Sequence, residues 1–271
     1  IIPTYQDTKR TYNLVRKIQE QVSADLSVEI LIADNNPEPQ FDFANAANVK
    51  AIHCREPGSY NARNKAILAS KGEVIIFTDS DCVPDPNWIS NIDRVMTNGN
   101  YDVVAGRTKI FRGNATELAY LFERNVAFNF DNMKSNRVAT TSNLIIRKNV
   151  LKDNLFNTVS FSGGDVEWTS KYSRNADILY DDKIIVLHPS RDSILHILKK
   201  DERVYGGFLK RQSHIKLFLS NFLPPVTQIK IAFSAKEKLS DKFKLLSIMI
   251  FLRYVRFYLH AKISLSGIYR R

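Results

Sequence analysis

The sequence predicts an α/β protein built on a mostly parallel sheet with helices on both faces. Three observations indicate this class. Short apolar runs rich in β-branched residues recur along the first two thirds of the chain, as in the buried strands of a parallel sheet. Segments with helical spacing of apolar residues separate these runs, which is the alternation of βαβ units. After residue 190 only helical periodicity remains, so we expect a C-terminal helical segment.

The individual elements follow from local signals. The helix expected at residues 9–21 carries Leu14, Ile18 and Val22 on one face, which is the spacing of an amphipathic helix. A proline near the first turn favours a helix at residues 84–97. The other expected helices are residues 60–70, 116–130 and 166–174, and the expected strands are residues 1–4, 28–33, 49–54, 74–78, 101–105, 139–147 (as an edge strand) and 184–187.

Composition and charge divide the chain in two. Its 271 residues are enough to bury a sizeable core, and 44% apolar with 25% charged residues is ordinary for a globular chain. The net charge of +11 is concentrated in residues 199–271, which hold 16 lysines and arginines against 4 acidic residues. We therefore expect an α/β domain over residues 1–190 and a basic helical region over residues 191–271, with an anionic partner for the basic region.

The cysteines and the start of the chain indicate the compartment. Cys54 and Cys82 fall at expected strand ends without the spacing of a metal site, so we expect free thiols in a reducing, cytoplasmic compartment. The chain opens inside an expected strand, and we expect a few residues before Ile1. No signal peptide is seen, and no apolar run approaches the ~20 residues that span a bilayer.

The most informative segment is residues 73–82, EVIIFTDSDC, in which a buried strand ends at Asp79 and Asp81. Ligands of open α/β sheets bind at the carboxyl ends of the strands. Two carboxylates placed there repel each other unless a cation lies between them, and Mg²⁺ or Mn²⁺ with a substrate diphosphate fits such oxygen ligands. The alternative is ordinary turn chemistry, since Asp and Ser are common in turns.

Further segments accompany the two aspartates in a fixed order. They are IIPTYQD at residues 1–7, LIADNN at 31–36, GSYNARNKAILASKGE at 58–73, SFSGGDVEW at 160–168 and VLHPSRDSILHILKKDERVYGGF at 186–208. Their order and spacing resemble the family 2 glycosyltransferases, whose GT-A fold is a Rossmann-like sheet flanked by helices. The resemblance covers residues 1 to about 208. It implies that residues 1–190 form a nucleotide-sugar-binding and catalytic domain.

The resemblance implies roles for the residues of the donor site. Thr4 and Asp34 match positions that hold the nucleotide base, although Asp34 also suits a turn. Asp79 matches the carboxylate that contacts ribose or metal-bound water, and Asp81 matches the metal ligand. Arg63 is placed to approach the diphosphate, with a solvated helix charge as the alternative.

On the acceptor side, Asp165 stands where the family has its general base, which takes the proton of the attacking acceptor hydroxyl. Asp165 also suits the N-cap of the following helix, and the two roles are compatible. Gly164 replaces a glutamate that many relatives carry. Glu167 and Trp168 fit the acceptor or sugar side, with the protein core as the default for Trp168.

Three basic residues near the end of the resemblance are further candidates for the expected donor site. His188 ends the last expected strand, where many relatives carry a histidine that reaches the metal or the diphosphate. A lone histidine is more often structural, but this one has fitting neighbours. Arg191 and Arg203 follow it as candidate diphosphate ligands, or as ordinary helix charges.

The basic C-terminal region predicts contact with a membrane surface. Residues 226–271 mix lysine with large apolar residues, and the run at 245–252 is too short to span a bilayer. Basic amphipathic helices lie in the interface, where each Lys or Arg near anionic lipid contributes about 1 kcal/mol. The alternative is a helical subdomain packed on the sheet with a solvated basic face. Nucleic acid is not favoured, because no recognition motif is present.

Together these patterns predict a metal-dependent, inverting glycosyltransferase. It would use a nucleotide-diphosphate sugar, with UDP favoured, and a glycan or lipid-linked acceptor. The resemblance suggests bacterial surface polysaccharide synthesis at the inner face of the cell membrane. One alternative is a nucleotidyltransferase, which would carry a glycine-rich basic loop that PTYQDTKR lacks. The other is a catalytically silent membrane-surface scaffold, against which the intact set of Asp79, Asp81, Asp165 and His188 argues.

Overall fold

A computed structural model of the chain describes residues 1–42, 48–159, 162–209 and 224–266. Two compact units divide the chain, and each is described by itself. The first, here called the sheet unit, comprises Ile1–Lys109, Phe130–Thr158 and Gly164–Pro189. The second, here called the helical unit, comprises Ile110–Asn129, Val159–Gly163 and Ser190–Arg271.

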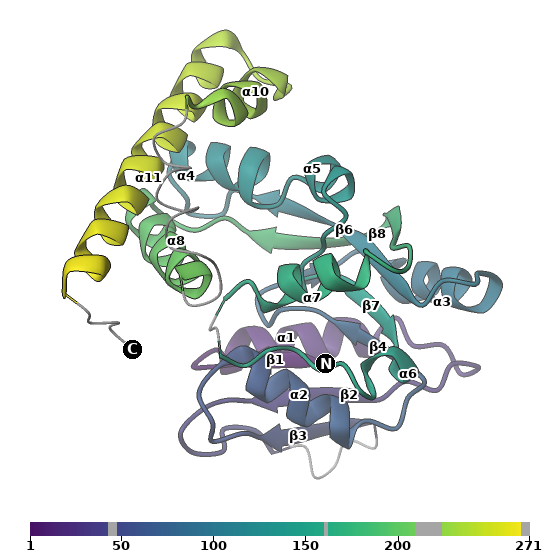
Figure 1. Ribbon diagram of the computed structural model, residues 1–271. Helices are drawn as coiled ribbons and strands as arrows, with labels where there is room; N and C mark the ends of the chain where they lie inside the picture. The colour runs from purple at the N-terminus through teal and green to yellow at the C-terminus, as the bar shows by residue number, and fades with distance from the viewer. Residues whose placement is uncertain (43–47, 160–161, 210–223, 267–271) are drawn as a thin grey trace. The chain divides into compact units, whose positions relative to one another are not determined.

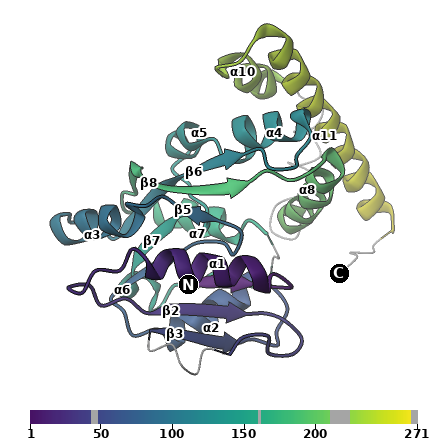
Figure 2. The same ribbon diagram turned by 180° about the vertical axis from the view of Figure 1, so that it is seen from behind.

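The sheet unit begins with three parallel strands in the order β1-β2-β3, at Ile2–Thr4, Ile30–Asp34 and Val49–His53. Every residue of β2 is buried, as expected for a strand covered on both faces. Helix α2 (Ser59–Ala69) lies in front of these strands in Figure 1, and helix α1 (Thr8–Gln19) lies in front of them in Figure 2. The two helices therefore cover opposite faces, and the expected βαβ pattern of this part is confirmed.

The rest of the sheet unit is built differently from the expectation. It is a five-stranded sheet in the order β4-β7-β6-β8-β5, in which β7 is antiparallel to both β4 and β6, and β5 is antiparallel to β8. The α/β class is confirmed, but these antiparallel pairings were not predicted. The strands are β4 (Val74–Phe77), β5 (Val83–Pro84), β6 (Val103–Phe111), β7 (Leu144–Arg147) and β8 (Leu179–Pro189).

The expectation of an edge strand at residues 139–147 is wrong. Strand β7 lies between β4 and β6, and its residues Leu144, Ile145 and Ile146 are completely buried. The weak alternation that suggested an edge came from residues 139–143, which precede the strand and form a polar loop. A strand with neighbours on both sides and helices around it carries a continuous apolar run instead.

Hydrogen bonds also join β1 to β4. The amino group of Ile1 donates to the Ile76 carbonyl at 2.7 Å, and the Thr78 amide donates to the Ile1 carbonyl at 3.3 Å. This is the exchange made by one residue of a parallel pair, so the three-stranded and five-stranded groups form one continuous mixed sheet. Asp34 at the end of β2 and Asp79 just after β4 consequently lie at the same edge.

Two helices differ from their expected bounds. Helix α3 (Trp88–Asn98) starts after residue 84, because Pro84 belongs to β5. The expected helix at 116–130 is divided into α4 (Glu117–Phe122), a π-helical turn (Glu123–Ala127) and, in the sheet unit, α5 (Phe130–Ser135). The other helices are α6 (Lys148–Leu151), α7 (Gly164–Tyr172), α8 (Ile194–Leu209), α10 (Val226–Ser234) and α11 (Leu239–Ser266).

The helical unit has its own apolar core. Helix α11 buries Leu245, Ile248, Met249 and Leu252, which have the spacing of one helix face. These side chains pack with residues of α4, α8 and α10, so this part of the basic region is a packed helical subdomain. Among the residues that the structure describes, no helix is long and apolar enough to cross a membrane.

Gly106 of β6 leaves no room for a side chain, and this gives a test of the packing. An added Cβ would lie 2.3 Å from Asn143 Nδ2 and 2.6 Å from the Ile184 carbonyl oxygen. We expect Gly106→Ala to lower the free energy of unfolding by roughly 1–3 kcal/mol, the usual cost of overpacking. Urea unfolding measures it. The control is Gly72→Ala, whose Cβ would meet its neighbours at 3.5 Å or more. Equal midpoints for the two variants would contradict this packing.

Candidate active site

The two aspartates of the D-x-D motif lie in the turn between β4 and β5, at the carboxyl end of β4, as the sequence predicts. The Cys82 amide donates to the Asp79 carbonyl at 3.0 Å and closes this turn. The residue between the aspartates is also held, because Ser80 Oγ donates to Asp7 Oδ2 at 2.9 Å. The backbone that carries both carboxylates is therefore fixed before any ligand binds.

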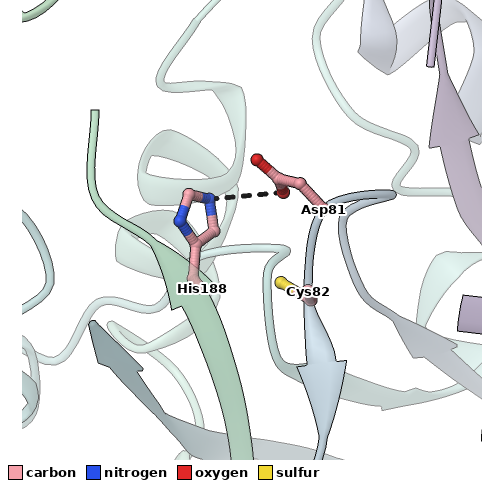
Figure 3. A group of neighbouring side chains, drawn as sticks. All are labelled: Asp81, Cys82 and His188. Atoms are coloured by element: carbon pink, nitrogen blue, oxygen red, sulfur yellow. Dashed lines mark ion pairs between the residues drawn. The ribbon is translucent and has the colours of Figure 1, made fainter. Parts of the chain in front are cut away.

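Strand register brings His188 to this turn. In the antiparallel pair of β5 and β8, Val83 lies opposite Leu187. The same register carried one residue further places Cys82 opposite His188. His188 Nε2 lies 3.5 Å from Asp81 Oδ1, and Figure 3 shows the ring turned towards that carboxylate. Two residues that are 107 positions apart in the chain therefore share one site.

The hydrogen bonding of His188 fits a metal ligand. Its Nδ1 lies 2.7 Å from the Pro189 carbonyl oxygen, which can only accept, so Nδ1 carries the proton. Nε2 then faces Asp81 Oδ1, where a protonated ring forms an ion pair and a neutral ring offers a lone pair to a cation. Burial raises the pKa of Asp81, the nearby His188 opposes this, and the Asp79 charge adds to it. A cation between the carboxylate and the imidazole would relieve this arrangement.

Cys82 is a third potential ligand that the sequence analysis did not select. Its Sγ, an Asp81 oxygen and a His188 nitrogen all lie within 4.8 Å of one another (Figure 3). Burial and the charges of Asp79 and Asp81 raise the pKa of Cys82 well above its ordinary value, so it stays a thiol. A protonated thiol is a poor ligand, and the carboxylate and imidazole that remain suit Mn²⁺ or Mg²⁺.

Arg63 is not a solvated helix charge, so that interpretation is wrong. Its side chain is only 5% exposed and its Nη2 lies 2.6 Å from Asp79 Oδ1. The two form a charge-assisted pair that orients Asp79, which is itself partly exposed. Contact of Arg63 with a diphosphate stays a prediction.

Asp165 is buried in a cage of four donors. Its Oδ1 accepts from the Tyr60 hydroxyl and the Val166 amide, both at 2.9 Å. Its Oδ2 accepts from the Thr141 amide at 2.9 Å and the Thr141 hydroxyl at 3.2 Å. Helix α7 begins at Gly164, so Asp165 lies inside the first turn and is not the N-cap that the sequence suggested. A carboxylate in that turn is still favoured by the helix dipole.

Helix α2 supports both acidic sites. Tyr60 and Arg63 are three residues apart and share one face, with the Arg63 guanidinium 5.5 Å from the centre of the Tyr60 ring. Arg63 holds Asp79, while Tyr60 holds Asp165. Burial and the charge of Asp165 raise the pKa of Tyr60, so its hydroxyl remains a donor. Tyr60 was not predicted from the sequence, although its spacing from Arg63 was a usable signal.

The Tyr60 ring also explains the glycine before Asp165. A Cβ on Gly164 would lie 2.9 Å from the Tyr60 ring, so no larger residue fits there without movement. A glutamate at this position would require the Tyr60 ring to move.

Thr4 and Asp34 occupy the expected strand ends and are both buried. Asp34 accepts from the Asn36 amide, from the Asn36 side chain and from the Gln40 amide, at 2.7–3.0 Å. It therefore forms the turn that was its alternative role. The Thr4 hydroxyl lies 2.9 Å from that of Thr11. Contact with a nucleotide base stays a prediction for both residues.

Trp168 belongs to the core, so its assignment to the sugar side is wrong. It is 3% exposed, stacks on Tyr172 with ring centres 5.5 Å apart, and donates to the Asn154 carbonyl at 2.6 Å. A sugar ring has no access to a face that is already covered. Glu167 forms an ion pair with Lys171 at 2.8 Å on the same helix, and its acceptor role stays a prediction.

Arg191 lies in the helical unit, where it pairs with the buried Glu123 at 2.5 Å. Glu123 stands at the start of the π-helical turn, and its Oε1 has no hydrogen-bond partner in the described part of the chain. Burial and the charge of Arg191 lower the pKa of Arg203. Arg191 thus compensates a buried carboxylate, and its diphosphate role stays a prediction.

The contact between Tyr60 and Asp165 can be tested directly. We expect Tyr60→Phe to lower the turnover rate by roughly 10- to 100-fold, because hydrogen bonds to charged groups contribute about 1.5–3 kcal/mol. The ring and its packing remain, so the thermal midpoint should change little. Tyr172→Phe is the control, since it removes a hydroxyl from the same unit that does not bond to Asp165. Equal turnover for both variants would exclude Tyr60 as a positioning residue.

Comparison with known proteins gives the family of the chain. The model of the family described as glycosyl transferase family 2 matches residues 1–171. Glycosyltransferase AglE of Haloferax volcanii is 29% identical over 220 residues, covering 76% of this chain and 71% of that protein.

Solved structures share the fold at low identity. S. aureus TarS 1–349 gives a TM-score of 0.56 at 17% identity, covering 98% of this chain and 74% of that chain. The mannosyltransferase PcManGT from Pyrobaculum calidifontis, in complex with GDP-Man and Mn²⁺, also gives 0.56, at 13% identity, covering 99% and 75%.

The mixed sheet, the acidic turn after β4 and these likenesses define a glycosyltransferase with the GT-A fold. Since the family model matches well over half of the chain, the protein belongs to glycosyl transferase family 2. The fold class and the family resemblance expected from the sequence are both confirmed.

Proposed function

We propose that this glycosyltransferase is metal-dependent and inverting, and that it uses a nucleotide-diphosphate sugar. The observation that carries the proposal is the pair formed by Asp81 and His188, which face each other at 3.5 Å at the carboxyl end of the sheet. A carboxylate oxygen and an imidazole nitrogen this close together are suited to a divalent cation. When bound there, Mn²⁺ or Mg²⁺ supplies Lewis-acid stabilisation of the leaving diphosphate.

The donor site is assigned to the sheet unit. We assign Asp79, which is held by Arg63, to the ribose, and we assign Thr4 and Asp34, at the ends of β1 and β2, to the base. Structures similar to this chain have been solved with UDP-GlcNAc and with GDP-Man, which supports a nucleotide-sugar donor. We favour a UDP-sugar. Arg63 is the candidate diphosphate ligand of this unit, and the diphosphate role expected for Arg191 from the sequence stays a prediction.

Asp165 is the group that we assign to the acceptor. As the acceptor oxygen attacks the anomeric carbon, its proton passes to Asp165 and the bond from that carbon to the diphosphate oxygen breaks. The four donors around Asp165 match the roughly four lone-pair positions of a carboxylate. The longest of these bonds is that of the Thr141 hydroxyl at 3.2 Å, and this is the donor that an acceptor hydroxyl replaces.

The acceptor is proposed to be a glycan or a lipid-linked glycan, with Glu167 on its side of the site. The basic C-terminal region supports a place at an anionic membrane surface, at the inner face of the cell membrane, where a lipid-linked acceptor is found. Synthesis of a bacterial surface polysaccharide fits this chemistry.

A donor screen tests the proposal. The protein is incubated with UDP-, GDP- and dTDP-sugars in Mn²⁺, Mg²⁺ or chelator, and release of the nucleoside diphosphate is measured. We expect release from one class of donor with metal and none with chelator. Metal-independent release would contradict the metal site. Pyrophosphate exchange with a nucleoside triphosphate would indicate a nucleotidyltransferase, and a failure to bind any nucleotide would indicate a silent scaffold.

A further inference from the structure

Helix α10 exposes a stripe of apolar side chains. Val226, Ile229 and Phe233 are all exposed and lie at positions i, i+3 and i+7, which is one face of the helix. Ala232, which is completely buried, and Ile231 pack into the core of the helical unit. Large apolar residues exposed singly are ordinary, but three on one face form a surface.

Helix α11 continues this surface. Phe243, Phe251, Tyr254 and Tyr258 follow one face of the helix and are 49–69% exposed, while the opposite face forms the core of the unit. Helices α10 and α11 contact each other along the chain reversal between them (Figures 1 and 2). The rings of Phe233 and Phe243 meet edge to face with centres 5.6 Å apart, so the two stripes join.

The joined surface has a basic border. Lys230, Lys236 and Lys238 are exposed on α10 and on the turn before α11. The two acidic residues near this turn are engaged within the helical unit. Glu237 pairs with Arg124, and Asp241 pairs with Lys244. The border therefore presents positive charge around an apolar centre.

Among residues 239–259, the basic side chains of α11 pair within the helical unit, and the exposed Lys244 beside Phe243 pairs with Glu117 and Asp241. Arg256 pairs with Asp201 at 2.5 Å, and Arg253 donates to Gln228. Lys242 donates to the Phe233 carbonyl at 2.9 Å. These side chains help to hold α11 in the helical unit. They bind carbonyl and carboxylate groups of neighbouring helices, which the mostly apolar inner face of α11 cannot hydrogen-bond.

We propose that this surface, here called the docking face, inserts into the headgroup boundary of a membrane that contains anionic lipid. The docking face comprises Val226, Ile229, Phe233, Phe243, Phe251, Tyr254 and Tyr258 with the bordering Lys230, Lys236 and Lys238. The inference takes up the membrane association proposed above and assigns it to these residues.

The composition of the docking face selects a lipid partner. Phenylalanine enters the apolar layer, tyrosine has a polar tip suited to the boundary, and lysine reaches the headgroups. A second copy of the chain is disfavoured, because a symmetric dimer would bring two lysine borders together. An anionic bilayer complements both the apolar centre and the positive border.

Substitution on the docking face is the appropriate test. Truncation at Pro224 would remove Leu245 and Ile248 from the core of the helical unit, so loss of binding would not be specific. Flotation of the full chain with phosphatidylcholine vesicles, with and without phosphatidylglycerol, measures binding. We expect binding to the anionic vesicles only, weakened by salt. Phe243→Ser with Phe251→Ser should weaken it at least about tenfold.

Two controls separate the possible outcomes. Leu68→Ser changes an apolar residue of the sheet unit that is 70% exposed, and it should bind vesicles like the unaltered protein. Lys236→Gln with Lys238→Gln should reduce binding and its salt dependence. Titration of every variant with UDP and Mn²⁺ measures nucleotide binding separately from vesicle binding. A failure of the proposed function can therefore be distinguished from a failure of the membrane inference.

Three results would overturn the inference. The first is unaltered protein that stays with the soluble fraction at low salt. The second is a phenylalanine variant that retains nucleotide binding and still binds vesicles with full affinity. The third is concentration-dependent self-association that the phenylalanine variant abolishes, which would identify the docking face as a contact between copies of this chain.

Discussion

Replacing Asp165 by asparagine is expected to lower the rate of sugar transfer by at least ~10²-fold, the usual contribution of a positioned base. The substitution preserves shape but removes the charge that draws the acceptor proton. Donor binding should persist, because Asp79 and Asp81 are unchanged. An amide in the cage also turns one donor towards the Tyr60 hydroxyl or the Thr141 amide, which themselves donate to the present carboxylate.

Single-turnover transfer to a competent acceptor and calorimetry of donor binding together measure this effect. The matched control is Asp177→Asn, which alters an exposed carboxylate of the same unit that pairs with Arg137. It should transfer at the unaltered rate. Full activity of Asp165→Asn would exclude the base role and leave the residue as part of the first turn of α7.

Replacing Asp81 by asparagine is expected to abolish metal-dependent nucleotide binding while the fold survives. Asp81 faces the Nε2 of His188, and its charge is what makes the pair attractive to a divalent cation. We expect a loss of at least about 100-fold in Mn²⁺ affinity, beyond that seen when an outer-shell partner is removed. The fold should tolerate the change, because burial already disfavours the ionised form of this carboxyl.

Electron paramagnetic resonance of free Mn²⁺, with UDP or GDP present, reports the affinity. Asp93→Asn serves as control, since Asp93 is an exposed carboxylate on α3 that accepts from Thr97. Unchanged Mn²⁺ affinity in Asp81→Asn would contradict the metal assignment. An equal loss of Mn²⁺ affinity in both variants would indicate a general effect of charge.

Local sequence signals predicted the first half of the fold well. Strands β1 to β4 and helices α1 and α2 follow from short apolar runs and helical spacing, and the D-x-D turn follows from its place after β4. These features depend on neighbours within a few residues. The central, antiparallel position of β7 depends on which distant strands pair with it. The residues at 139–147 do not by themselves indicate which strands these are.

The site shows the same limit. His188 was expected at the metal, but its contact with Asp81 and Cys82 arises from the register of β5, a strand of two residues that is too short to give a pattern. Arg63 and Trp168 were each given two roles because burial cannot be read from residue type alone. In the C-terminal region composition indicated the basic charge, whereas the face that carries it was set by ion pairs such as Arg256 with Asp201.

The metal assignment is tested most directly by a crystal structure of the full chain with UDP and Mn²⁺, with anomalous scattering collected for manganese. We expect one manganese peak at coordination distance from an Asp81 oxygen and from His188 Nε2, beside the diphosphate, with Asp165 free of the metal. A diphosphate bound with no manganese between Asp81 and His188, or manganese held by other residues, would contradict it.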